Sequence, residues 1–133
     1  MRAFLVLVAF LIGSFAVARA DDVAAAQSVI RSQEEAFARD DAAGAYSFAA
    51  PGIKSWYRTP DTFMYMVRNG YAPVYRHRSF EFGAAVTKDG EIVQEVQIVD
   101  ADGVAWDAVY TLEPQSDGSL KISSCILKKA VTS

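Results

Sequence analysis

The spacing of apolar residues divides the chain into a helical half and a strand half. Between Asp21 and Asp41, apolar side chains recur at intervals of three and four, as from Ile30 to Phe37. This period predicts one amphipathic helix, with Asp21 and Asp22 as N-cap candidates. From Phe80 onward the interval changes to two, which is typical of strands with one buried face.

Two shorter helices are predicted before the strands begin. Asp41 is suited to cap a helix over residues 42–49, and Thr59-Pro60 is a typical N-cap and first helical position for a helix over 61–69. Residues 71–76 follow, and we expect Pro73 to keep them extended as a connection to the second half.

The second half predicts four strands separated by turns that contain Gly90, Gly103 and Gly118. Short turns between alternating segments favour an antiparallel meander. Because helices come first and strands follow, the predicted fold class is α+β, with the N-terminal helices packed on one face of the sheet.

The first 20 residues have the order of a secretory signal peptide. Met1-Arg2 is basic, Ala3 to Val17 is nearly all apolar, and Ala18-Arg19-Ala20 is a small-x-small cleavage site. The apolar run is shorter than the ~20 residues that span a bilayer. We expect cleavage between Ala20 and Asp21 and a periplasmic or secreted protein. The expected division is 1–20 signal peptide, 21–127 one α+β domain and 128–133 a flexible tail.

Charge and residue usage exclude several classes of function. Loss of Arg2 and Arg19 reduces the 13 basic residues to 11 against 16 acidic ones, a net charge of about −5. Such a domain is a poor binder of nucleic acid or an anionic membrane. Cys125 is the only cysteine and His77 the only histidine, so neither a disulfide nor a typical zinc site is expected within one chain. No cofactor motif and no catalytic triad is apparent.

Large side chains concentrate between Tyr46 and Phe82, which holds ten of the 16 aromatic residues. So many large side chains must supply core, the lining of a cavity, or both. Apolar pockets with a few polar groups are the usual form of a small-molecule site. Arg76 could hold a ligand carboxylate, or equally brace a helix C-terminus. The candidate ligand-binding residues are Trp56, Tyr57, Phe63, Tyr71, Tyr75, Arg76, Trp106 and Tyr110.

Four segments, in order, resemble a bacterial family known only as domain of unknown function 4864. They are AFARDDAAGAYSFAAPGI, TFMYMVRNGYAPVYR, VQEVQIVDADG with the following Trp106, and DGSLKISSCIL. The resemblance covers residues 30–127. It implies membership of the superfamily named after nuclear transport factor two and ketosteroid isomerase. That superfamily implies a cone-like fold, in which a curved four-stranded meander wraps over the helices and encloses a cavity, an arrangement also called cystatin-like. The resemblance brings no catalytic residues.

Three functions remain open on these observations. The first is a non-enzymatic binding module with an aromatic-lined pocket for a small apolar or amphipathic ligand. The second is an isomerase- or lyase-like enzyme that uses a pocket carboxylate. Asp107 is the candidate, if its strand turns it inward rather than toward solvent. The third is an interaction protein with a filled core that forms a homodimer.

Overall fold

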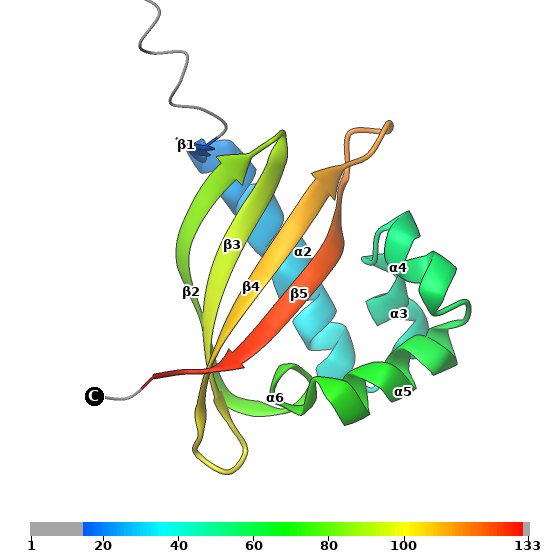
Figure 1. Ribbon diagram of the computed structural model, residues 1–133. Helices are drawn as coiled ribbons and strands as arrows, with labels where there is room; N and C mark the ends of the chain where they lie inside the picture. The colour runs from blue at the N-terminus through cyan, green and yellow to red at the C-terminus, as the bar shows by residue number, and fades with distance from the viewer. Residues whose placement is uncertain (1–14, 132–133) are drawn as a thin grey trace, which may run out of the picture.

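Helices make up most of the first half of the molecule and strands the second half (Figure 1). The computed structural model describes residues 15–131. Its helices are α2 (Ala20–Ala38), α3 (Ala42–Ser47), α4 (Pro51–Trp56), α5 (Pro60–Gly70) and α6 (Ala72–Tyr75). Its strands are β1 (Phe15–Val17), β2 (His77–Lys88), β3 (Glu91–Asp100), β4 (Ala105–Pro114) and β5 (Leu120–Lys129).

The strands form one open antiparallel sheet in chain order, β1-β2-β3-β4-β5. The fold is therefore α+β, but the expected count of four strands is wrong for the described chain. The additional strand, β1, pairs with Val86–Lys88 at the end of β2 and lies within the expected signal peptide. The predicted turns contain three glycines with a positive φ, which glycine adopts without strain: Gly90, Gly103 and Gly118.

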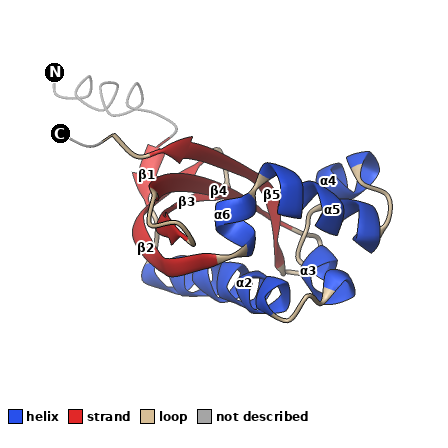
Figure 2. Cartoon of the chain, turned by 90° about the horizontal axis from the view of Figure 1, so that it is seen from below, coloured by secondary structure: helices blue, strands red, loops and turns tan. Residues whose placement is uncertain are grey.

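Helix α2 packs along the inner face of the sheet and contributes part of the core (Figures 1 and 2). Its buried residues include Ile30 and Phe37, and the alternation in β3 places Val96 and Ile98 among the facing side chains. The sheet bends over this helix, so one face is covered and the other faces solvent (Figure 2).

Two expectations about the helices need correction. Arg19, not an aspartate, is the N-cap of α2. Asp21 and Asp22 lie in the first turn, where the positive end of the helix dipole stabilises their negative charges. Residues Ala72–Tyr75 form a helical turn rather than an extended connection. The fixed φ of Pro73 suits the first turn of a helix, which needs no N–H from that residue.

The predicted caps of the two middle helices are confirmed. The amide of Gly44 donates to Asp41 Oδ1 at 2.9 Å, and the amide of Thr62 donates to Thr59 Oγ1 at 3.1 Å. Strand β5 continues to Lys129, which is two residues into the segment expected to be a tail.

Helices α3, α4 and α5 lie beside the free edge of β5 (Figure 1). The amide of Ala50 donates to Ile122 O, and the amide of Ile122 donates to Phe48 O, both at 2.8 Å. These two bonds cover part of the exposed edge of β5, which would otherwise leave its backbone groups open to other strands. None of the helices between residues 15 and 131 is both long enough and apolar enough to cross a membrane.

Candidate functional site

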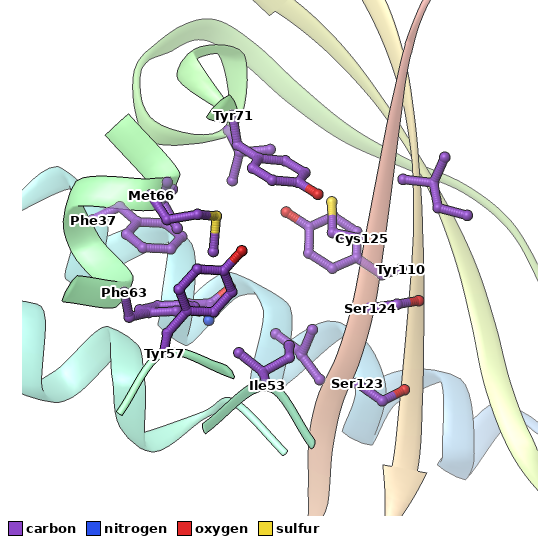
Figure 3. Close-up of a pocket in the computed structure, with 15 residues that line it drawn as sticks. Phe37, Ile53, Tyr57, Phe63, Met66, Tyr71, Tyr110, Ser123, Ser124 and Cys125 are labelled. Carbon is purple, nitrogen blue, oxygen red and sulfur yellow. The ribbon is translucent and has the colours of Figure 1, made fainter. Parts of the chain in front are cut away.

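A cavity of about 360 Å³ lies between the helical layer and the edge of the sheet (Figure 3). Its helical wall comes from α2, α4, α5 and α6, and its sheet wall from β4 and β5. The lining residues are Gln33, Phe37, Ile53, Tyr57, Phe63, Met66, Val67, Tyr71, Val74, Tyr110, Ile122, Ser123, Ser124, Cys125 and Ile126.

The helical wall is apolar because the buried stripes of α2 and α5 meet there. The rings of Phe37 and Phe63 stack with centroids 6.3 Å apart, and both side chains are almost fully buried. Met66 extends from the next position of the α5 stripe toward the space in front of them (Figure 3). Aromatic and thioether groups give this wall a large, polarisable surface.

Tyr110 and Cys125 form the floor of the cavity on the sheet side. They are direct partners across β4 and β5, and the Tyr110 hydroxyl donates a hydrogen bond to the sulfur of Cys125. Burial raises the pKa of the Tyr110 hydroxyl well above its ordinary value, with smaller contributions from Cys125 and Glu34. Burial also raises the pKa of the Cys125 thiol to about 12, although the Tyr110 hydrogen bond acts in the opposite direction. Both groups are therefore neutral at ordinary pH.

Two further tyrosine hydroxyls face the cavity with no hydrogen-bond partner among the described residues, those of Tyr57 and Tyr71. Tyr57 is held by its backbone, because the Tyr46 hydroxyl donates to Tyr57 O at 2.6 Å. The hydroxyl of Tyr71 points toward Cys125 across the cavity (Figure 3). Burial, followed by the neighbouring Cys125 and Tyr57, raises the pKa of Tyr71. Tyr71 is thus a neutral donor.

Gln33 contributes the buried amide of the lining. Its side chain is on the stripe of α2 between Ile30 and Phe37, and the residue is 5% exposed. Its Nε2 donates to Ala45 O at 3.1 Å, which ties α2 to α3. Its Oε1 accepts no hydrogen bond from any described residue. The sequence interpretation missed Gln33, although its spacing from Ile30 and Phe37 places it on the buried face of the helix.

The structure brings four of the eight candidate residues together. Tyr57, Phe63, Tyr71 and Tyr110 all line the cavity. Trp56 does not, because α4 turns it outward and leaves it 83% exposed.

Trp106 lies next to the cavity, in a separate depression that also borders Tyr71 and Cys125. Its indole Nε1 donates to Asp100 Oδ2 at 2.9 Å, so the indole N–H already has a partner at the end of β3. The main cavity does not include Trp106 among its lining residues.

Tyr75 and Arg76 lie away from the cavity and join α2 to the start of the sheet. The hydroxyl of Tyr75 donates to Asp40, and Arg76 Nη2 pairs with the same carboxylate at 2.9 Å. These hydrogen bonds, Tyr75 first and Arg76 second, lower the pKa of Asp40. Arg76 Nη1 also donates to Phe37 O at 2.8 Å, in the last turn of α2. Arg76 therefore braces a helix C-terminus, one of the alternatives that the sequence left open.

Asp107 lies on the solvent side of the sheet and is exposed. The alternation of β4 directs Ala108 and Tyr110 inward and turns Asp107 outward. No aspartate or glutamate is among the residues that line the cavity. Asp107 therefore cannot be the inward-facing pocket carboxylate of the second hypothesis. Between residues 15 and 131, no group of three or more His, Cys, Asp or Glu side chains is arranged to hold a metal ion.

The lining from β5 was not predicted from the sequence. Ser123, Ser124 and Ile126 lie on a strand whose edge position decides that they meet the helices. The sequence also does not single out Phe37, Ile53, Val67 and Val74 as lining residues, since a buried residue beside a cavity has the same apolar spacing as one in a filled core.

Comparison with known proteins identifies the family and nothing narrower. A family model with the description "Domain of unknown function (DUF4864)" matches residues 19–133. No curated protein and no solved structure matches the chain. Because the match spans nearly the whole chain, this protein belongs to the family Domain of unknown function (DUF4864).

Proposed function

We propose that this protein is an exported, non-enzymatic module that binds a small apolar or amphipathic molecule in the cavity between α5 and β5. The observation that carries the proposal is the hydrogen-bonding state of the lining. An aromatic cavity of about 360 Å³ presents the hydroxyls of Tyr57 and Tyr71 without a partner among the described residues. Apolar cavities of this size with a few polar groups are the common form of a ligand site.

The chemistry of the lining favours binding over catalysis. A catalytic group needs a pKa close to the working pH, or an activating partner. Here burial moves the pKa values of Tyr110 and Cys125 upward, away from neutrality. A thiol with a pKa of about 12 is almost entirely protonated and is a weak nucleophile at neutral pH. The cavity therefore offers hydrogen bonds and apolar surface.

The N-terminal sequence and the curvature of the sheet support the finer parts of the proposal. The family match begins at residue 19, beside the expected cleavage site after Ala20, as it would if the conserved domain followed a removable leader. The sheet that bends over α2 fits a cone-like fold of the type named after nuclear transport factor two (Figure 2). A periplasmic or secreted binding protein is consistent with both.

Native mass spectrometry of the protein, purified gently from its expressing cells, tests the proposal. We expect an added mass of a few hundred daltons that disappears on denaturation. The cavity-filling variant Met66→Trp should carry much less of it. Tyr65→Trp is the matched control, because Tyr65 is on the same helix but 64% exposed and outside the lining. A bare mass for the wild-type protein, with no binding of added aromatic probes, would contradict the proposal.

A further inference from the structure

The cavity lining is mostly apolar and carries no charged side chain, and the tyrosine hydroxyls and the Gln33 amide in it differ in what they offer a ligand. No lysine, arginine, aspartate or glutamate is among the residues that line it. Tyr57 and Tyr71 offer hydroxyl donors, whereas Gln33 offers the acceptor Oε1, because its Nε2 is already bonded to Ala45 O. A neutral hydroxyl can accept as well as donate, but an amide oxygen can only accept.

The buried side-chain amide of Gln33 also points to a ligand. Gln33 is 5% exposed and lines the cavity, yet its Oε1 has no donor among the described residues. No side-chain oxygen or nitrogen of the described chain is both unpartnered and fully sealed from solvent, so this oxygen keeps some contact with open space, and Gln33 lines the cavity. A buried acceptor without a donor costs free energy, and a ligand that donates a hydrogen bond to it removes that cost.

We propose, on the basis of the ligand-binding function above, that the cognate ligand is an uncharged, ring-sized molecule that carries both a hydrogen-bond donor and an acceptor. The donor bonds to Oε1 of Gln33, and the acceptor receives the hydroxyl of Tyr71. The apolar body of the ligand lies against Phe37, Phe63 and Met66. A carboxylate or ammonium is disfavoured because the lining provides no counter-charge for a desolvated ion.

The proposal separates three probes that share one ring system and differ only at its ends. They are 2,6-dihydroxynaphthalene, which has donors and acceptors, 2,6-dimethoxynaphthalene, which keeps only the acceptors, and 6-hydroxy-2-naphthoate, which is an anion at neutral pH. Ligand-observed NMR titration gives a Kd for each. We expect the dihydroxy probe to bind at least about tenfold more tightly than the naphthoate. We expect it to bind about two- to tenfold more tightly than the dimethoxy probe.

Matched variants assign the acceptor contact to Tyr71. Tyr71→Phe removes one hydroxyl and should weaken the dihydroxy probe about two- to tenfold, the effect of one neutral hydrogen bond. Tyr65→Phe removes an exposed hydroxyl of α5 that lies outside the lining and should change no Kd.

The outcomes distinguish this inference from the proposed function. If none of the three probes binds, this inference is overturned, and the proposed function is overturned with it when the native protein also carries no added mass. If the naphthoate binds as tightly as the dihydroxy probe, the cavity accepts a charged head group. The proposed function then stands and this inference fails. Equal binding of the dimethoxy probe, or an unchanged Kd in Tyr71→Phe, also overturns the inference while leaving the cavity a binding site.

Discussion

The imidazole Nε2 of His77 lies 2.6 Å from Oε2 of Glu34, and this contact joins the first residue of β2 to α2. The other ring nitrogen, Nδ1, lies 2.9 Å from Pro73 O, while the second oxygen of Glu34 pairs with Arg31 at 2.5 Å. The imidazole also packs on the ring of Phe80, with centroids 5.0 Å apart. Glu34 and His77 are largely shielded from solvent, at 16% and 13% side-chain exposure, so this cluster fastens the sheet to the helix that it covers.

Replacing Glu34 by Gln should weaken that attachment. The amide keeps the shape of the side chain but removes the negative charge of Glu34, which contacts both His77 and Arg31. We expect a loss of about 2 kcal/mol in the free energy of unfolding, because hydrogen bonds to charged groups are worth more than neutral ones. Urea unfolding followed by circular dichroism measures it.

Glu35→Gln is the control for this substitution. Glu35 is the next residue of α2 and is exposed, and its side chain makes no hydrogen bond with the described residues. Its replacement should leave the unfolding midpoint nearly unchanged. Equal effects of the two substitutions would mean that the His77 contact contributes nothing beyond surface charge.

Arg76→Ala should reduce stability without changing the affinity of the cavity for its ligand. The guanidinium donates to Phe37 O at the end of α2, and loss of that bond should cost about 1 kcal/mol. The exposed pair with Asp40 should add little, since solvent screens it. Thermal unfolding and a probe titration measure the two quantities separately. Arg58→Ala, at an exposed position with no hydrogen bond to the described residues, should alter neither. A lower affinity in Arg76→Ala would restore the ligand role that the sequence suggested.

Stability should fall in alkaline solution in a way that depends on Cys125. Burial raises the pKa of this thiol from 9.0 to about 12 in the folded chain. Between these values the unfolded chain loses the proton and the folded chain keeps it, so the contribution is complete below pH 9 and disappears as the pH rises toward 12. One such group gives a slope of roughly 1.4 kcal/mol per pH unit.

Urea unfolding at several pH values above 9 checks this prediction, with Cys125→Ala as the comparison. The alanine variant should have a shallower decline, although the raised pKa values of Tyr71 and Tyr110 leave part of it in place. Parallel declines in the two proteins would show that the thiol ionises equally easily in both states.

A chain that begins at Asp21 should keep the fold while it loses β1 together with Arg19 and Ala20, the N-cap and first residue of α2. That strand is three residues long and pairs with Val86–Lys88 of β2. It forms the opposite edge of the sheet from β5, which lines the cavity. Mass spectrometry of the exported protein should give the mass of residues 21–133. Amide exchange should be faster at Val86–Lys88 than in the full chain and unchanged in β4 and β5. A global loss of protection would show that β1 is needed for the fold.

The elements of the fold were largely predictable because they depend on local signals. The Thr59-Pro60 start of α5 and the glycine turns of the sheet each depend on a few adjacent residues. The helical turn at Ala72–Tyr75 was missed because Pro73 suits both an extended segment and a first helical turn.

The site was less predictable because it depends on contacts between distant elements. Tyr57, Phe63, Tyr71 and Tyr110 could be proposed from their bulk alone. The serines of β5 meet the cavity only because β5 is the edge strand beside α4, which the order of strands in space decides. Arg76 has the same sequence appearance as a ligand-binding arginine, and only the position of Phe37 O assigns it to the helix end.

Backbone-to-backbone hydrogen bonds between the helical layer and the sheet occur at a single residue of the described chain, Ile122. Elsewhere the two are held by side chains, and an arrangement of this kind opens locally at a lower free energy than the sheet itself. The contact of α4 with β5 is therefore expected to open at a lower free energy than the pairing of β3 with β4. A local opening of this kind would let the cavity exchange its contents without unfolding of the sheet.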